Sequence, residues 1–251
     1  MATKELAGRV AIVTGAGRNI GRAIALALAD AGASIVVNAR DSRAEAEAVA
    51  REIEAGGTKA LVQLGNVADA AAVQAMADAT YKHFGRIDIL VNNAALRREK
   101  PFFEMDYSEW REILDVTLDG AFHCVKACLP SLRKSGAGTI VNIGGLSAHT
   151  GAKDRAHVVT AKAGLIGFTR ALAHDLAADG ITVNCVVPGL IGTSRPKDKP
   201  EPAHHLTHQT ITGERGRPED VAATVRFLCG PGARYINGQA IHANGGAYLG
   251  A

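Results

Sequence analysis

The sequence predicts an α/β fold in which helices cover both faces of a parallel, seven-stranded sheet. Short runs of apolar, β-branched residues alternate along the chain with longer segments whose apolar residues recur at helical spacing. The short runs are apolar at successive positions, which is typical of strands buried on both faces. Strands of this kind occur in parallel sheets that carry helices on each side.

The elements follow from this alternation. Seven segments are predicted as strands: 9–14, 34–38, 60–64, 87–91, 138–143, 181–187 and 239–243. Six segments are predicted as helices: 20–31, 42–55, 69–84, 108–133, 155–178 and 218–228. The segment 192–216 fits neither pattern and contains three prolines and three histidines. Long loops in compact domains are usually functional or disordered, so we expect a lid on the substrate side of a single domain spanning 1–251.

Composition excludes several classes of protein. The chain has 251 residues, of which 47% are hydrophobic, so it is too apolar to be disordered. A net charge of +3 without a basic stripe does not indicate nucleic-acid binding. No apolar run approaches the roughly 20 residues of a membrane span, so we expect a cytoplasmic protein. The four cysteines lack the spacing of a metal site or a disulfide scaffold and are expected to be buried thiols.

A glycine-rich segment lies directly between the first predicted strand and the first predicted helix. Its residues are Gly15, Ala16, Gly17, Arg18, Asn19, Ile20 and Gly21. Glycines in this context let backbone N–H groups and the helix N-terminus approach a pyrophosphate closely. The segment therefore predicts a dinucleotide site of the Rossmann type, and the alternative is a tight turn without a ligand.

Further segments, in the same order, resemble landmarks of the short-chain dehydrogenase/reductase family. They are Asn-Asn-Ala-Ala at 92–95, Pro-Gly-Leu-Ile-Gly-Thr at 188–193, Gly-Arg-Pro-Glu-Asp-Val at 216–221 and Asn-Gly-Gly at 244–246. The resemblance covers nearly the whole chain and is to the 3-oxoacyl-carrier-protein-reductase-like members. It implies a doubly wound dinucleotide-binding fold and a homotetramer.

The resemblance also assigns residues to the cofactor cleft. It implies that Ile20, Asn93, Ala94, Pro188 and Gly189 line the cleft, that Asn66 and Val67 contact adenine, that Ile191 and Thr193 meet the nicotinamide carboxamide, and that Lys162 reaches the nicotinamide ribose. The form of the cofactor depends on charge at the adenosine ribose, where an acid would repel a 2′-phosphate. We place Asn38 at that position and expect Arg18 and Arg40 to face the ribose, which favours NADP(H) over NAD(H). Asp41 weakens this preference if it pairs with Arg40.

The catalytic positions depart from the family. The resemblance implies a proton-transferring Tyr four residues before the Lys, a Ser that holds the substrate oxygen, and an Asn on the long central helix. Lys162 is present, but Val158, Gly145 and Thr117 occupy the other three positions. Valine cannot transfer a proton and glycine has no side chain, so the usual mechanism is unavailable.

Three residues are candidates for a relocated proton donor. His149 follows the fifth strand in a loop that could swing over the cleft, and an imidazole titrates near neutrality. Ser147 offers a hydroxyl two residues beyond Gly145, and Lys162 can itself act as an acid if burial lowers its pKa. Each has an ordinary alternative as a polar loop residue or a ribose ligand. His157 is offset by about 100° around the helix from Val158 and is expected to point away from the Lys162 face.

Cations border the nicotinamide end of the predicted cleft. They are Arg97, Arg98 and Lys100 after the fourth strand, and His149, Lys153 and Arg155 before the Lys162 helix. Of these, we select Arg97 and Arg155 as candidate contacts to an anionic substrate, and solvated loop charges are the alternative. We expect no metal site, since the histidines at 204, 205 and 208 have no acidic or cysteine residue beside them.

Three hypotheses on function remain. The first is an NADP(H)-dependent oxidoreductase acting on a small carbonyl or hydroxyl compound with a non-standard proton donor. The second is a dinucleotide-binding pseudoenzyme, because three catalytic residue types are missing together. The third is a non-redox reaction in the same cleft, since site chemistry and not fold decides function.

Overall fold

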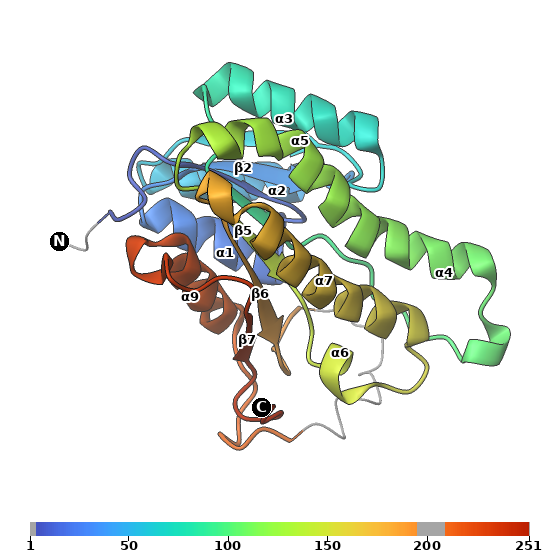
Figure 1. Ribbon diagram of the computed structural model, residues 1–251. Coiled ribbons are helices and arrows are strands. Elements are labelled where there is room, and N and C mark those ends of the chain that lie inside the picture. The colour runs from blue at the N-terminus through green and yellow to red at the C-terminus, as the bar shows by residue number, and fades with distance from the viewer. Residues whose placement is uncertain (1–3, 195–208, 251) are drawn as a thin grey trace.

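The computed structural model describes residues 4–194 and 209–250. Its centre is a seven-stranded parallel sheet with the order β3-β2-β1-β4-β5-β6-β7 (Figure 1). The strands are β1 (Val10–Val13), β2 (Ser34–Ala39), β3 (Ala60–Leu64), β4 (Ile89–Asn92), β5 (Thr139–Ile143), β6 (Thr182–Pro188) and β7 (Ala240–Ala243). Every predicted strand is present, and the predicted fold class is confirmed.

Helices connect the strands in the predicted order. They are α1 (Asn19–Asp30), α2 (Arg43–Ala55), α3 (Ala70–Phe84), α4 (Tyr107–Leu114), α5 (Gly120–Lys134), α6 (Ser147–Thr150), α7 (Ala156–Asp175) and α9 (Pro218–Cys229). A π-helical turn, Asp115–Asp119, joins α4 to α5, so the predicted helix 108–133 changes its hydrogen-bond pattern midway. The sequence pattern did not indicate this turn or the short helix α6.

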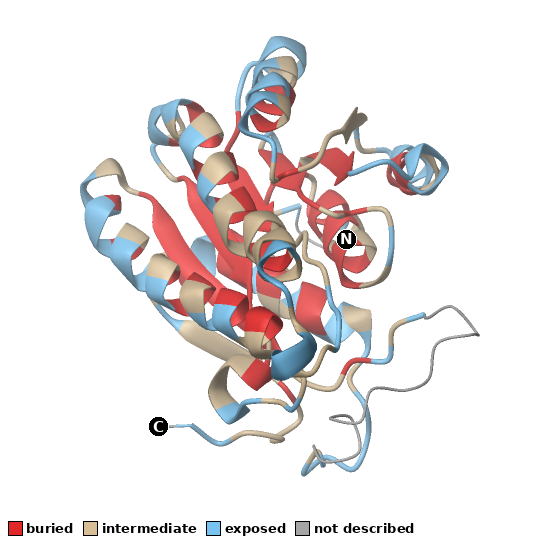
Figure 2. Ribbon diagram, turned by 90° about the vertical axis from the view of Figure 1, so that its right-hand side faces the viewer, coloured by how far each residue is buried: buried red, intermediate tan, exposed pale blue. Residues whose placement is uncertain are grey.

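The helices form two layers around the sheet. Buried residues of α1, α2 and α9 pack in one hydrophobic cluster, and buried residues of α3, α5 and α7 pack in another. Successive strand residues face opposite layers, as Ile35 and Val37 belong to the first cluster and Val36 to the second. Figure 2 shows the consequence, with buried strands in the middle and helices whose outer faces are exposed.

The strand order indicates where a ligand can bind, at the carboxyl ends of inner strands of the sheet. Chain order reverses direction between β1 and β4, which are neighbours in the sheet. Ligands of doubly wound folds bind at such a switch point, outside the carboxyl ends of the strands. The ends of β1, β4, β5 and β6 therefore define where a site can form.

The two ends of the segment 192–216, which we predicted to be a lid, lie next to each other. Ile191 and Gly216 form an isolated parallel bridge, and the Gly192 N–H donates to the carbonyl of Gly216 at 2.8 Å. The structure describes 192–194 and 209–216 of the lid, while the histidines at 204, 205 and 208 lie outside the described residues.

Two compositional points can be checked directly. All four cysteines are free and buried, as predicted. Among the described residues, no helix combines the length and apolar character that crossing a membrane requires.

Candidate active site

The glycine-rich turn is locked into a shape that only glycine permits at two positions. Gly15 has a φ of +61°, in the left-handed region. A Cβ at Gly21 would overlap the carbonyl oxygen of Gly15 and lie 2.6 Å from the Asn93 amide nitrogen. That nitrogen donates to the carbonyl oxygens of Thr14 at 2.8 Å and Gly15 at 3.0 Å, which ties the turn to the end of β4. The turn leads directly into the N-terminus of α1, a favourable place for a pyrophosphate.

Asn38 does not face the adenosine ribose, contrary to the prediction. It is 2% exposed, and its amide oxygen accepts from the Gly15 N–H at 3.3 Å. Its amide nitrogen donates to the carbonyls of Gln63 at 3.1 Å and Gly65 at 3.2 Å. Strand β2 ends at Ala39, so Asn38 lies inside the strand and its amide holds the glycine turn against β3. The last residue of the strand is Ala39, so no acidic residue stands at the end of β2.

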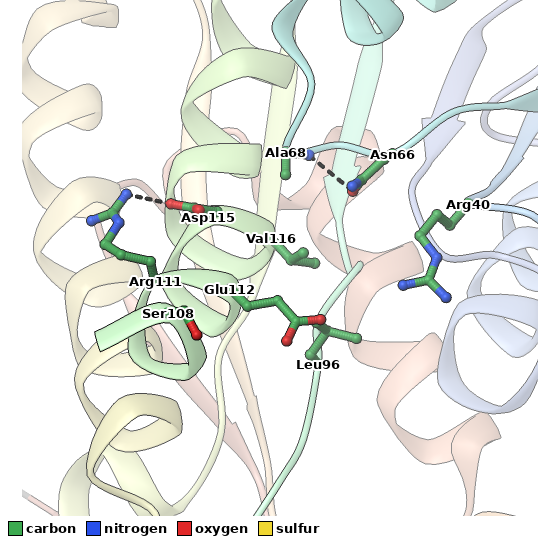
Figure 3. Close-up of a pocket in the computed structure, with 9 residues that line it drawn as sticks. All are labelled: Arg40, Asn66, Ala68, Leu96, Ser108, Arg111, Glu112, Asp115 and Val116. Atoms are coloured by element: carbon green, nitrogen blue, oxygen red, sulfur yellow. Dashed lines mark hydrogen bonds and ion pairs between the residues drawn. The ribbon is translucent and has the colours of Figure 1, made fainter. Parts of the chain in front are cut away.

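A cleft of about 320 Å³ lies where the adenosine half of a dinucleotide is expected (Figure 3). Its wall includes Arg40 after β2, Asn66 and Ala68 after β3, Leu96 after β4, and residues of α4 and the π-turn such as Val116. The amide oxygen of Asn66 accepts from the Ala68 N–H at 3.1 Å, which fixes the turn before α3.

The predicted ribose arginines differ in their surroundings. Arg18 is exposed beside the glycine turn. Arg40 pairs with Asp41 at 2.9 Å, and both side chains are more than half exposed, so the pair is weak and a phosphate can compete for the guanidinium. The pairing anticipated from the sequence is therefore present.

The segment after β6 contacts the glycine turn. The amide oxygen of Asn19 accepts from the Ser194 N–H at 3.0 Å and from its hydroxyl at 2.8 Å. Ile191 is 9% exposed, and Thr193 between them is partly exposed. At Gly189 a Cβ would lie 2.6 Å from Cα of Asn244, so the Pro188-Gly189 segment packs closely against the end of β7.

Lys162 is the central charged group at the other end of the crevice. It lies on α7, is 7% exposed, and its ammonium donates to the carbonyl of Ile143 at the end of β5 at 2.5 Å. Burial and the charges of Arg97 and Arg155 lower its pKa to about 7, while the Cys185 thiol acts in the opposite direction. Both protonation states are therefore populated near neutral pH.

The structure shows the surroundings of Gly145, Val158 and Thr117, the three residues expected at the family's other catalytic positions. A Cβ at Gly145 would meet only Cγ of Lys162, at 3.8 Å, so the space beside the lysine chain is open. Val158 lies one turn before Lys162, is 3% exposed, and packs with Ile113 and Ala161. Thr117 is buried in the π-turn, and its hydroxyl has no hydrogen-bond partner. π-helical turns inside α-helices are frequent at functional sites.

His149 was expected in a loop that could swing over the cleft. In the structure it lies in the short helix α6 and packs in an aromatic cluster. Its ring centroid lies 4.6 Å from that of His242 and 5.1 Å from that of Tyr248. Its Nε2 is buried without a hydrogen-bond partner, and burial followed by the charge of Arg170 lowers its pKa. Ser147 begins the same short helix and is 9% exposed. Their roles as proton donors stay predictions.

The two rim loops meet, but their cations behave differently. The Lys100 N–H donates to the carbonyl of Asp154 at 2.7 Å, which joins the loop after β4 to the loop before α7. Arg98 forms a two-pronged ion pair with Glu112, and Lys100 pairs with Glu104 at 3.9 Å.

Lys153 is exposed, whereas Arg155 is 7% exposed. Arg97 and Arg155 are the two rim cations whose charges lower the pKa of Lys162, and their role as contacts to an anionic substrate stays a prediction. His157, expected to point away from Lys162, is 0% exposed with neither ring nitrogen bonded. Within 4–194 and 209–250, no three His, Cys, Asp or Glu side chains are grouped to hold a metal ion.

Comparison with known proteins gives a consistent result. The family model described as enoyl-(acyl carrier protein) reductase matches residues 15–248. The chain is 40% identical over 240 residues to the 3-oxoacyl-[acyl-carrier-protein] reductase FabG of Staphylococcus aureus, covering 95% of this chain and 98% of the relative. It is 41% identical over 245 residues to the 3-oxoacyl-[acyl-carrier-protein] reductase of Synechocystis sp., covering 97% and 98%.

Solved structures agree. A dehydrogenase/reductase from Sinorhizobium meliloti superposes with a TM-score of 0.92 at 33% identity, covering 98% of both chains. A short chain dehydrogenase from Burkholderia cenocepacia, in complex with NADP, superposes with a TM-score of 0.90 at 36% identity, covering 97% of this chain and 99% of that one. The chain belongs to the short-chain dehydrogenase/reductase family and is similar to its 3-oxoacyl-[acyl-carrier-protein] reductases.

Proposed function

We propose that the chain is an NADP(H)-dependent oxidoreductase that acts on a small, negatively charged carbonyl or hydroxyl compound and uses a non-standard proton donor. The observation that supports this most is the position of Lys162, buried at the nicotinamide end of the crevice and within the electrostatic reach of Arg97 and Arg155. Cations that converge on a buried site favour a carboxylate or phosphate on the substrate.

The residues of the crevice fit a nicotinamide dinucleotide. Gly15, Gly21 and the N-terminus of α1 suit the pyrophosphate, and the cleft beside Asn66 and Val116 suits the adenosine. Arg18 and Arg40, with no acid at the end of β2, favour the 2′-phosphate of NADP(H). The Burkholderia relative binds NADP, which supports the same form.

Of the three candidates, we assign the role of proton donor to Lys162. When bound, the nicotinamide supplies or accepts a hydride at the substrate carbon. The ammonium of Lys162 donates a proton to the substrate oxygen, because a pKa of about 7 makes it a far stronger acid than an exposed lysine. The open position at Gly145 lies beside Cγ of Lys162, and Arg97 and Arg155 are the cations that we propose to hold the anionic end of the substrate.

Absorbance of NADPH at its reduced-nicotinamide band, recorded with a panel of small oxo acids, tests this function. We expect Lys162→Met to abolish turnover, and His149→Phe and Ser147→Ala to retain it. If His149→Phe or Ser147→Ala abolishes turnover while Lys162→Met does not, the donor is assigned wrongly. Tight NADPH binding without turnover on any compound would favour the pseudoenzyme hypothesis, which the absence of the usual Tyr, Ser and Asn motivates.

The cofactor preference has its own matched pair of variants. Arg40→Ala should weaken NADPH binding and leave NADH binding unchanged. Asp41→Asn should strengthen NADPH binding, because it releases Arg40 from its ion pair. Fluorescence titration measures both, and tighter binding of NADH than NADPH by the unmodified protein would refute the assignment.

We also expect a homotetramer. Phe102 and Phe103, in the short turn before α4, and Tyr107, the first residue of α4, are 73%, 87% and 76% exposed, and aromatic groups this exposed favour a protein interface. Light scattering coupled to size exclusion measures the assembly, and a monomer would contradict this expectation.

A further inference from the structure

Asn19, in the glycine-rich turn, has a backbone conformation that glycine adopts more easily. Its φ is +50°, in the left-handed region, and it is the first residue of α1. Among the described residues, Asn19 and Asp154 are the only non-glycine residues with a positive φ. Asparagine tolerates this region better than most residues, but glycine enters it without a steric cost. The side chain of Asn19 is therefore what distinguishes this position from a glycine.

The Asn19 side chain bonds to a segment that is distant along the chain. Its amide oxygen accepts from the Ser194 N–H at 3.0 Å and from the Ser194 hydroxyl at 2.8 Å, and its amide nitrogen donates to the Ser194 carbonyl at 3.5 Å. We call this contact the clasp. Near its other end, the same segment is held by the Gly192 N–H, which donates to the Gly216 carbonyl at 2.8 Å. Residues 191–194 are thus fixed on both sides.

The clasp spans the carboxyl ends of two strands. Asn19 follows β1 and Ser194 follows β6, and β4 and β5 lie between these strands in the sheet. Neighbouring strands are about 4.8 Å apart, so β1 and β6 are separated by roughly 14 Å. A hydrogen bond between residues that follow them therefore closes a bridge over the ends of β4 and β5. These strand ends, beside the switch point between β1 and β4, are where a dinucleotide binds in doubly wound folds.

We infer that Asn19 is a positioning residue, which holds 191–194 across the crevice and thereby sets the rate at which a dinucleotide enters and leaves. The inference rests on the proposed binding of a dinucleotide to the glycine turn, whose pyrophosphate is expected at the N-terminus of α1, beside the clasp. The clasp joins two protein segments and uses no group of the dinucleotide. It therefore stabilises the closed crevice equally with and without a dinucleotide, and its loss should raise the association and dissociation rates together.

Hydrogen exchange, followed by NMR, tests the clasp in the nucleotide-free protein. In Asn19→Gly the backbone keeps its conformation, because glycine adopts a positive φ readily, and only the side chain is lost. We expect the Ser194 amide to exchange about ten times faster in this variant, because its N–H loses the Asn19 oxygen. The Gly192 amide, which bonds to Gly216, should exchange at the same rate in both proteins. Equal exchange of the Ser194 amide in the two proteins would overturn the inference.

Stopped-flow fluorescence of NADPH measures the exchange of the dinucleotide. Asn19→Gly should raise both the association and the dissociation rate constants about tenfold and change the dissociation constant by less than about threefold. Ser194→Ala should raise both rate constants less, because its N–H still bonds to Asn19. Combining the two substitutions should add nothing to Asn19→Gly, since the hydroxyl then has no partner to lose. Asp154→Gly, at the other described non-glycine residue with a positive φ, is the matched control and should leave both rate constants unchanged.

The outcomes separate this inference from the proposed function. Rate constants that Asn19→Gly leaves unchanged overturn the inference. A loss of affinity of about tenfold that comes from the dissociation rate alone also overturns it, because Asn19 would then contact the dinucleotide itself. Neither measurement needs turnover, so failure to reduce a carbonyl compound contradicts the proposed function and leaves the predicted rates as stated. A protein that binds neither NADPH nor NADH contradicts both.

Discussion

Replacing Lys162 by Met should stabilise the folded protein near neutral pH. The substitution removes the amine and keeps an unbranched chain of similar length in the same buried position. In the folded protein the pKa of Lys162 is lowered from 10.5 to about 7, first by burial and then by the charge of Arg97. The folded state therefore resists the ammonium form, and the unfolded chain does not.

The size and sign of the effect follow from this pKa. Between about pH 7 and pH 10.5 the unfolded chain binds more protons, so the free energy of unfolding rises with pH across this window and is lowest below it. At about 1.36 kcal/mol per unit of pKa, the full cost of burying the ammonium is roughly 5 kcal/mol. The variant also loses the hydrogen bond to the Ile143 carbonyl, which costs about 1–3 kcal/mol. A net gain of roughly 2–4 kcal/mol near pH 7 remains.

Urea denaturation at pH 7 and pH 10, at one protein concentration, measures this difference. The advantage of Lys162→Met should shrink toward zero or reverse at pH 10, because the lysine is neutral in the folded protein there and the pH is close to the unfolded pKa of 10.5, so little of the cost of burying the ammonium remains. Lys126→Met, at an exposed position, should change the free energy of unfolding by less than about 0.5 kcal/mol at both values. A Lys162→Met protein that is less stable at pH 7, or whose advantage does not depend on pH, would refute the reasoning.

Three further predictions concern other parts of the fold. Gly21→Ala should abolish dinucleotide binding measured by fluorescence, because the added Cβ would overlap the Gly15 carbonyl oxygen. Gly167→Ala, where a Cβ would meet open space in α7, should instead raise the free energy of unfolding by about 0.5–1 kcal/mol. His157 has its pKa lowered chiefly by burial, so stability should fall as pH drops below about 6.5, and thermal melts of His157→Leu should lose that dependence. The four buried cysteines should react with a thiol reagent only after urea unfolding, and burst labelling of the native protein would contradict this.

The positions of the elements expected to hold the cofactor were largely predictable from sequence, because each depends on a local pattern. The glycine turn, the end of β4 and the lysine of α7 each depend on short-range spacing, and each lies where the pattern placed it. Asn38 shows where such spacing is insufficient. Strand β2 ends one residue later than predicted, at Ala39, so Asn38 lies inside the strand and its buried side chain bonds to the backbone of Gly15, Gln63 and Gly65. Its amide therefore serves the glycine turn instead of the ribose.

The substrate half depends on contacts between distant segments, which no local pattern shows. The ring of His149 packs on His242 and Tyr248 near the end of the chain. Arg98 pairs with Glu112, whereas the charges of Arg97 and Arg155 lower the pKa of Lys162. The sequence shows where the cations are in the chain, but only the folded structure shows which of them have charges that act on Lys162.

The π-helical turn Asp115–Asp119 sets the rotation of α5, which packs on the sheet, relative to α4, which packs on α7. A π-turn holds one residue more than an α-turn, and one residue corresponds to about 100° of rotation. Deleting a residue there would rotate α5 against α4 and carry the buried face of Cys124 and Cys128 off the sheet, or else move α4 away from α7. Because of the extra residue, α5 covers the sheet while α4, in the same continuous helix, lines the cleft.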